Sequence, residues 1–167
     1  MVDCGEFCTF TQAKTLYVKM DRFIGNIDAK MDVKGRVFIP ASFRKILQTT
    51  GDTRLILRKD VYQKCLVLYP GNIWEEELTE LRSRLNKYNE EQQQIFRQFV
   101  MGAELLEMDS SGRILIPKRY LQMANISSDV RFIGMDYTIE IWGRTPSGKL
   151  PLDEEEFKEN FSKHLGQ

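Results

Sequence analysis

One pattern of eleven residues occurs twice in the sequence, and this duplication constrains the fold more than any other feature. Residues 30–40 read KMDVKGRVFIP, and residues 107–117 read EMDSSGRILIP. The two copies are offset by 77 residues, and the same offset joins further matching pairs: Gly25 and Gly102, Asp52 and Asp129, and Arg54 and Arg131. A constant offset over this length indicates an internal duplication. Each repeat is too small to bury much surface alone, so we expect the two repeats to share one core.

Each copy of the pattern contains Asp-x-x-Gly between two apolar runs, which predicts a tight turn between two strands of a β-hairpin. Asp32 and Asp109 can each accept a hydrogen bond from the backbone N–H two residues further on. Gly35 and Gly112 permit a left-handed backbone without a Cβ clash. Turn chemistry therefore explains the aspartates and the glycines, but not the arginine that follows each glycine.

Arg36 and Arg113 allow two interpretations. Either arginine could lie at a solvated strand end or form an ion pair with the aspartate of its own loop. The duplication favours a second interpretation, because two rigid turns that each present a cation suit a ligand with several negative charges. Duplex DNA is such a ligand, since arginine can bind phosphate or guanine through two hydrogen bonds.

These motifs resemble the MraZ family of bacterial transcriptional regulators, which are tandem relatives of the AbrB/SpoVT swapped-hairpin DNA-binding fold. The resemblance rests on residues 32–40 and 109–117, and it continues through residues 66–70 and 139–142. One departure matters, because the second loop (residues 109–112) has Ser111 where the first loop (residues 32–35) has Lys34. The two loops therefore need not contact DNA equally.

The resemblance implies a mixed α+β fold, a pseudo-symmetric β-barrel of two AbrB-like swapped-hairpin repeats with helices between and after them. The expected boundaries are 23–71 for the first repeat, 72–99 for connecting helices, 100–143 for the second repeat, and 144–167 for a linker and C-terminal helix. Residues 1–19 have no counterpart before the second repeat, so we expect a disordered extension or a misassigned start. A chain that begins at Met20 should then keep its stability and DNA affinity.

The resemblance also implies a function: sequence-specific binding to repeated promoter boxes upstream of a cell-division and cell-wall gene cluster that includes the protein's own gene, with repression as the outcome. It implies a ring-shaped homo-oligomer, in which many loops raise the overall affinity through effective concentration. The expected DNA-binding residues are Lys34, Gly35, Arg36, Gly112 and Arg113, with Asp32 and Asp109 shaping the loops.

Charge is unevenly distributed along a chain whose formal net charge is zero. Residues 30–59 contain eight Lys or Arg and two Asp, a local charge of +6, whereas residues 153–159 contain five acids and one Lys. Only the surface that carries the loops needs to be positive for DNA binding, so neutrality does not exclude it.

Other residue types exclude several classes of protein. Three cysteines, an odd number, argue against a disulfide framework and for a reducing compartment. Cys4 and Cys8 could form half of a metal site, but the only histidine is His164 near the far end of the sequence, so we expect no zinc site. Cys65 suits a buried apolar position. No segment has the character of a membrane span or a signal peptide. We therefore expect a cytoplasmic, nucleoid-associated protein.

We expect no enzyme, cofactor, metal or small-molecule substrate, because the sequence lacks a phosphate-binding glycine loop, a metal-binding helix motif and a nucleophile with a histidine partner. Two other functions remain open from sequence. One is a ring-forming scaffold that binds protein and not DNA. The other is an antitoxin-like module, which would need a tail that folds on a toxin.

Hydrophobic patterns predict the elements of each repeat. Strands are expected at residues 23–31, 36–39, 54–59 and 65–69, and again at 104–108, 113–116, 130–134 and 138–142. Residues 37–39 are all apolar, which predicts burial on both sides of that strand, with the second cover supplied by the other repeat or by another subunit. A helix should follow Pro40, and a short helix should contain Tyr120 and Leu121.

The region between the repeats predicts two helices. Asn72 with Glu75 is typical of a helix N-terminus. The apolar stripe of these helices favours a core-facing surface, part of which could instead contact another subunit; it comprises Trp74, Leu78, Leu81, Leu85, Tyr88, Ile95, Phe96, Phe99 and Val100. Asp153 with Glu156 predicts a capped C-terminal helix with Phe157, Phe161 and Leu165 on one face.

Overall fold

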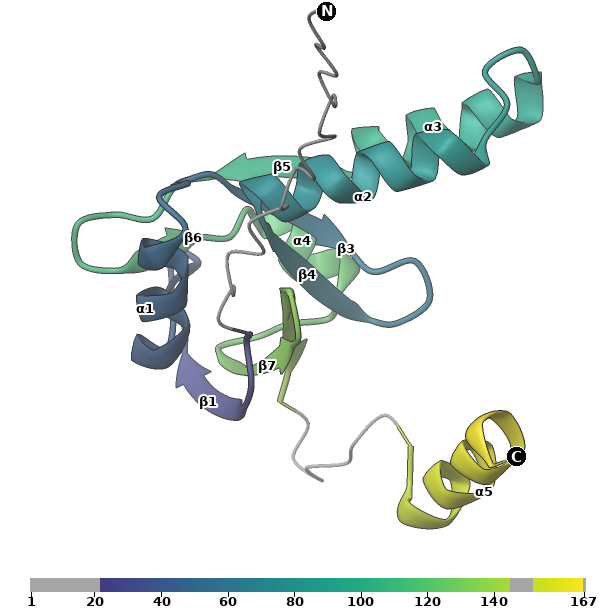
Figure 1. The fold of residues 1–167 in the computed structure, drawn as a ribbon. Helices are drawn as coiled ribbons and strands as arrows, with labels where there is room; N and C mark the ends of the chain where they lie inside the picture. Colours follow the sequence, from purple (N-terminus) through teal and green to yellow (C-terminus); the bar gives the residue numbers. More distant parts are fainter. Residues whose placement is uncertain (1–21, 145–151, 167) are drawn as a thin grey trace, which may run out of the picture.

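A computed structural model of the chain describes residues 22–144 and 152–166 (Figure 1). The first repeat contains β1 (Asn26–Lys30), β2 (Arg36–Phe38), α1 (Ala41–Thr49), β3 (Leu55–Lys59) and β4 (Cys65–Pro70). The second contains β5 (Ala103–Leu106), β6 (Arg113–Leu115), α4 (Lys118–Met123), β7 (Asp129–Met135) and β8 (Thr138–Gly143). Between them lie α2 (Gly71–Arg84) and α3 (Glu90–Met101), and α5 (Glu154–Leu165) follows. The fold is therefore mixed α+β, and both repeats have the same order of elements.

The strands of the two repeats pair mostly with each other. Six strands form an antiparallel sheet in the order β1-β7-β8-β4-β3-β5, and β2 pairs with β6 in a separate two-stranded ribbon. The first strand of each repeat lies beside the third strand of the other, β1 beside β7 and β5 beside β3. The simple hairpin expected at each motif is therefore wrong. Beyond one isolated bridge between Met31 and Val37, β1 and β2 separate, because each finds a longer ladder in the other repeat.

The sheet has two free edges, β1 and β5. Within the described residues the hydrogen-bonded ladders do not close into a barrel, so the pseudo-symmetric barrel stays a prediction. The β2–β6 ribbon itself is symmetric in register, because Arg36 lies opposite Leu115 and Phe38 lies opposite Arg113, the equivalent pairs of the two repeats.

Strand pairing shows that the 77-residue offset does not hold throughout the repeat. Ala29 and Leu106 are 77 residues apart, and they pair with Val130 and Leu55, which are 75 residues apart. The segment between the motif and the third strand is therefore two residues shorter in the second repeat. The matches of Asp52 with Asp129 and of Arg54 with Arg131, which the 77-residue offset suggests, are therefore not structurally equivalent pairs.

The larger of two hydrophobic clusters among the described residues joins the two repeats, as expected. It is built from both copies of the motif and the helices that follow them, including Val37, Ile39, Phe43, Ile114, Ile116 and Tyr120. Full burial of one such side chain contributes about 1.5–3 kcal/mol, and a shared core lets two short repeats bury more of them. Cys65 is also buried, and this burial raises the pKa of its thiol to about 12, so its prediction as a buried small residue is confirmed.

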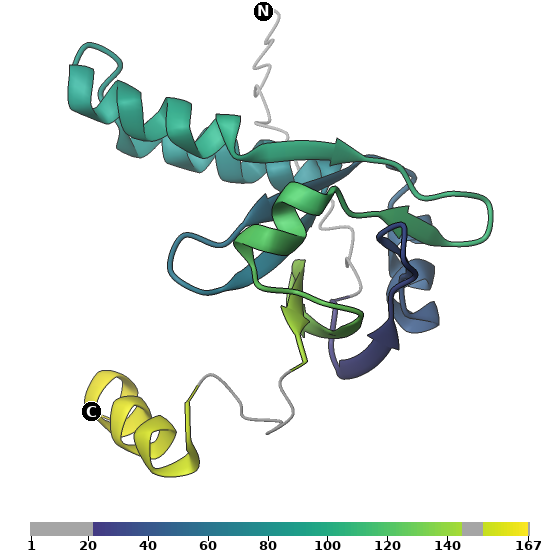
Figure 2. The same cartoon turned by 180° about the vertical axis from the view of Figure 1, so that it is seen from behind.

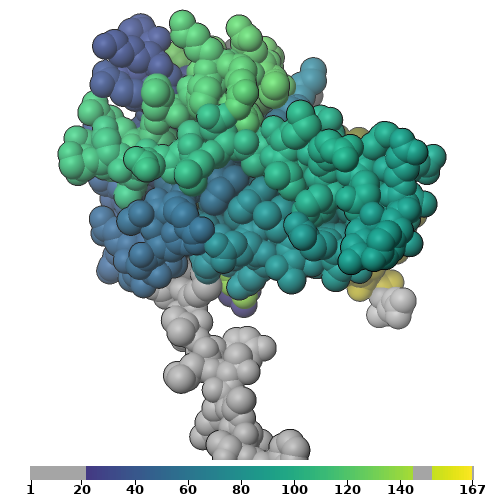
Figure 3. Space-filling model, turned by 90° about the horizontal axis from the view of Figure 1, so that it is seen from above, coloured from purple at the N-terminus to yellow at the C-terminus, as the bar shows by residue number. Residues whose placement is uncertain are grey.

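Helices α2 and α3 form an arm that extends to one side of the sheet (Figures 1 and 3). The Trp74 ring stacks on the Phe99 ring at 5.5 Å, and the Arg58 guanidinium lies 3.9 Å from the centre of the Phe99 ring. The apolar stripe is thus shared between the two helices, and none of its predicted members is fully buried. Tyr88 lies beyond the end of α2 and is 86% exposed, so it does not face the core, and a contact with another subunit stays a prediction.

The helix ends agree with the sequence in one case and differ in another. Helix α2 begins at Gly71 after Pro70 without a side-chain cap, so Asn72 is not its N-cap. Helix α5 has the predicted capping box, in which the Asp153 carboxylate accepts from the Glu156 N–H at 2.8 Å. No helix among the described residues has both the length and the apolar character needed to cross a membrane. The expectations for residues 1–19, Cys4, Cys8 and the linker at 145–151 lie outside the described residues.

Replacing Gly35 by alanine should destabilise the fold more than replacing Gly51. The two glycines have φ values of +89° and +68°, so either variant carries left-handed strain of about 1–2 kcal/mol. A Cβ at Gly35 would also lie 2.7 Å from the carbonyl oxygen of Ile116, whereas a Cβ at Gly51 meets no described atom within 4 Å. Urea unfolding measures both losses, and equal losses would contradict a tight contact between the repeats.

Candidate nucleic-acid interface

Loop 1 (residues 32–35) and loop 2 (residues 109–112) have the same hydrogen bonds. In loop 1, Asp32 Oδ1 accepts from the backbone N–H of Lys34 and of Arg36, both at 2.9 Å. In loop 2, Asp109 Oδ1 accepts from Ser111 and Arg113 in the same way, also at 2.9 Å. The bond from the N–H two residues on, predicted for each aspartate, is therefore present in both loops.

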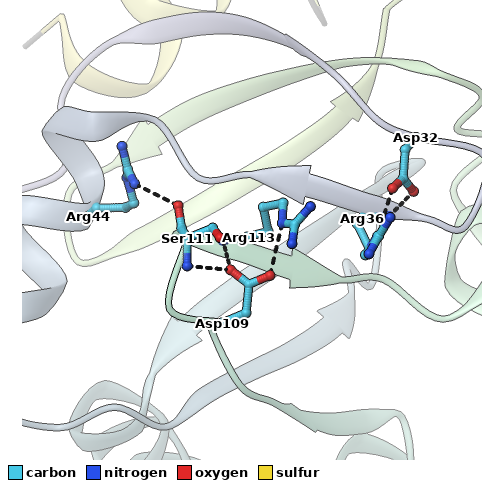
Figure 4. Close-up of polar contacts among 6 residues, drawn as sticks. All are labelled: Asp32, Arg36, Arg44, Asp109, Ser111 and Arg113. Atoms are coloured by element: carbon cyan, nitrogen blue, oxygen red, sulfur yellow. Dashed lines mark hydrogen bonds and ion pairs between the residues drawn. The ribbon is translucent and has the colours of Figure 1, made fainter.

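Each aspartate also holds the arginine of its own loop (Figure 4). Arg36 Nε donates to Asp32 Oδ2 at 2.7 Å, and Arg113 Nε donates to Asp109 Oδ2 at 2.9 Å. The ion pair, which was one of the two interpretations of these arginines, is thus formed. It uses one of the five guanidinium N–H donors and fixes the orientation of the side chain, which leaves the terminal nitrogens to meet a ligand.

These contacts lower the pKa of both aspartates below the ordinary value of 3.8. The main cause is the hydrogen bond from the backbone N–H of Arg36 or Arg113, and the side-chain bond from the same arginine adds to it. Each loop is therefore shaped by a carboxylate that remains charged at neutral pH.

The β2–β6 ribbon has one buried face and one exposed face. Val37 and Ile114 point into the core. The neighbouring positions on each strand point outward, because side chains alternate along a strand. Phe38 is 53% exposed, so the other repeat does not provide the second cover predicted for residues 37–39, and cover by another subunit stays a prediction.

The exposed face combines cations with apolar groups. It carries Arg36, Phe38, Arg113 and Leu115, of which the two arginines occupy diagonal corners. The Arg113 guanidinium lies 5.6 Å from the centre of the Phe38 ring. Diagonal positions on such a ribbon are about 7–8 Å apart, so both guanidinium groups can act on one ligand.

Gly35 and Gly112 connect the repeats. The Gly35 carbonyl accepts from Ile116 N–H at 2.9 Å, and the Gly112 carbonyl accepts from Ile39 N–H at 3.0 Å. Both glycines are buried, with φ values of +89° and +86°. Both glycines therefore lie beneath the surface of the predicted interface, where they join each loop to the opposite repeat. Other loop positions are more accessible, such as Val33, which is 98% exposed.

The two loops have different surroundings. Loop 1 carries the exposed Lys34 and borders a surface pocket that is also lined by Lys118 from α4. Loop 2 lies beside α1, as both ribbon views show, and Arg44 Nη1 donates to the Ser111 carbonyl at 3.1 Å (Figures 1, 2 and 4).

Sequence patterns do not place Lys118 or Arg44 at the loops, because each belongs to the repeat opposite to the loop beside it. The one hint in the sequence is a difference between the repeats, since the position equivalent to Arg44 holds Leu121. The described residues contain no group of three side chains able to hold a metal ion.

Comparison with known proteins gives consistent matches. The family model described as "MraZ protein, putative antitoxin-like" matches residues 23–97 and 99–147, one copy of the motif in each segment. A protein named transcriptional regulator MraZ from Bacteroides fragilis is 60% identical over 138 residues, 83% of this chain and 87% of that protein. Proteins of the same name from Bacteroides thetaiotaomicron and Phocaeicola vulgatus are 59% identical over 138 residues (83% and 88%) and 54% identical over 145 residues (87% and 94%).

The charged loops should make stability depend on pH in the acidic range. Folding lowers the pKa of Asp32 and of Asp109. Their contribution to the free energy of unfolding is therefore complete above the unfolded-state pKa of 3.8, and it is lost as the pH falls through the folded-state pKa. The variant Asp32→Asn/Asp109→Asn should be less stable than the wild type at pH 7, and the difference should shrink on acidification. Chemical unfolding across this range tests it, with Glu80→Gln on α2 as control. A difference that widens on acidification would contradict the assignment.

Proposed function

The chain belongs to the MraZ family, and on this premise we propose that it is a sequence-specific DNA-binding transcriptional regulator. The observation that carries the proposal is the exposed face of the β2–β6 ribbon. On this face each repeat presents one arginine, and the aspartate of its own loop holds the guanidinium in place. The relatives named above are transcriptional regulators by name, which agrees with such a role.

The ribbon suits the major groove of DNA. This groove admits a two-stranded ribbon, and arginine binds guanine through two hydrogen bonds. Arg36 and Arg113 would read base edges or bind phosphates, and Phe38 and Leu115 between them would contact apolar groups such as the thymine methyl. Lys34 would bind a phosphate, because it is exposed in the loop that leads into Arg36.

The proposal includes assembly of several copies of the chain into one particle. One ribbon makes few contacts, so a single chain would bind weakly. A ring-shaped homo-oligomer that meets several promoter boxes would gain affinity through effective concentration. The proposed target is the promoter of a cell-division and cell-wall gene cluster that includes the protein's own gene, with repression by occupation of that promoter, in the cytoplasm at the nucleoid. Closure of the strands into a pseudo-symmetric barrel belongs to the same proposal.

A second candidate function is protein binding, either as a scaffold or as an antitoxin-like module. The observation that favours it is α5, whose apolar residues Phe157, Phe161 and Leu165 are all exposed. The two functions differ in one measurement, because a protein that binds only protein shows no salt-dependent binding to DNA.

Replacing Arg36 by alanine should weaken binding to DNA from immediately upstream of the protein's own coding sequence. Loss of one bidentate contact costs about 1–3 kcal/mol, so a shift in Kd of about tenfold or more is expected. Lys34→Ala should lower the slope of log affinity against log salt by about one. Fluorescence anisotropy measures both effects.

Two variants control this experiment. Arg84→Ala removes an exposed arginine that pairs with Glu80 on the α2 arm, and it should bind like the wild type. Asp32→Asn/Arg36→Ala removes the carboxylate that Arg36→Ala would leave unpaired near DNA, and it should still bind weakly. Wild-type affinity and salt dependence in all Arg36 variants would refute the proposed interface.

A further inference from the structure

The two loops do not carry the same charge. Loop 1 and the arginine after it contain Asp32, Lys34 and Arg36, a net charge of +1. Loop 2 and its arginine contain Asp109 and Arg113, which neutralise each other. Since Asp32 pairs with Arg36 in the same way, the excess positive charge of loop 1 comes from Lys34. Loop 2 has Ser111 at this position and lacks a cation of its own beyond the paired arginine.

A cation from the other repeat stands at loop 2. Arg44, on α1, donates from Nη1 to the Ser111 carbonyl oxygen at 3.1 Å (Figure 4). It lies so close to the loop that a Cβ built on Gly112 would be 2.6 Å from the Arg44 Cδ atom. Among the described residues Arg44 forms no ion pair, so its charge is not neutralised there.

Packing alone does not require a charge at this position. The repeat-equivalent residue is Leu121, which packs beside loop 1 with its Cδ1 atom 3.7 Å from a Cβ built on Gly35. A leucine therefore fills the space between helix and loop. At Arg44 the Nε atom is buried without a hydrogen-bond partner in the described structure, which costs free energy that leucine would not cost. Packing therefore does not account for the charge at this position.

We infer that Arg44 is the DNA-phosphate-binding cation of loop 2 and takes the place of the lysine that this loop lacks. The inference rests on the proposed DNA-binding function. Each loop then presents one arginine paired with aspartate and at least one further cation: Arg44 at loop 2, and Lys34 with the neighbouring Lys118 at loop 1. Both loops would present positive charge to DNA, although their cations come from different elements.

The inference makes loop 2 a composite of both repeats. Its turn and Arg113 come from the second repeat, whereas its unpaired cation comes from α1 of the first. The exchange of strands makes this possible, because the Ile39 N–H bond to the Gly112 carbonyl holds the chain just before α1 against loop 2.

Three variants of the full-length protein test the inference on duplex DNA from immediately upstream of its own coding sequence. Arg44→Leu copies the residue of the other repeat, and it should weaken binding and lower the salt slope by about one. Arg44→Gln keeps a donor for the Ser111 carbonyl but removes the charge, and it should show the same loss. Arg44→Leu/Ser111→Lys returns a cation to the loop and should recover both the affinity and the slope.

The outcomes separate the roles that Arg44 could have. If Arg44 only braces the loop, Arg44→Gln binds like the wild type with an unchanged salt slope, and Ser111→Lys rescues nothing; the inference is then overturned. Thermal unfolding of each variant identifies any loss of folding in Arg44→Leu, in which case Arg44→Gln decides. If Arg36→Ala weakens binding but the Arg44 variants do not, this inference alone fails. If none of these variants weakens binding, the proposed function fails with it.

Discussion

Two hydrogen bonds between the repeats fix the positions of both loops and of the β2–β6 ribbon. The carbonyl of each loop glycine accepts from the isoleucine N–H that precedes the proline of the opposite repeat, Gly35 from Ile116 and Gly112 from Ile39. They extend the β2–β6 ladder at both ends and hold each loop against the other repeat. Both require glycine, because the backbone is left-handed and, at Gly35, a carbonyl oxygen occupies the space of a Cβ. Each loop therefore depends on a second copy of the motif for its position.

The exposed ribbon face follows from this arrangement. The aspartate of each loop binds two backbone N–H groups and one guanidinium, so the arginine is oriented before any ligand arrives. A pre-oriented side chain loses less conformational entropy on binding than a free one. Ion pairs this exposed contribute little to stability. These ion pairs instead orient the two guanidinium groups, which is what the proposed binding to DNA needs.

The sequence predicts local features well and the partners of the strands poorly. The turn around Asp32 and Gly35 and the capping box at Asp153 depend on residues within a few positions, and they form as expected. The errors concern contacts made with the other repeat: the strand that pairs with β2, the exposure of Phe38 and the position of Arg44 beside loop 2. Which repeat supplies the neighbouring strand depends on contacts far apart in the sequence, and the repeated motif fits either choice equally.

Site-specific photo-cross-linking to upstream DNA tests most directly whether the two loops contact DNA together. A photoreactive residue would replace Val33 at the tip of loop 1 or Ser110 at the tip of loop 2, and Tyr88 on the α2–α3 arm would serve as control, since all three are exposed. We predict cross-links from both loops, suppressed by unlabelled DNA of the same sequence, and none from position 88. Cross-links from one loop alone, or from the arm and neither loop, would contradict this account.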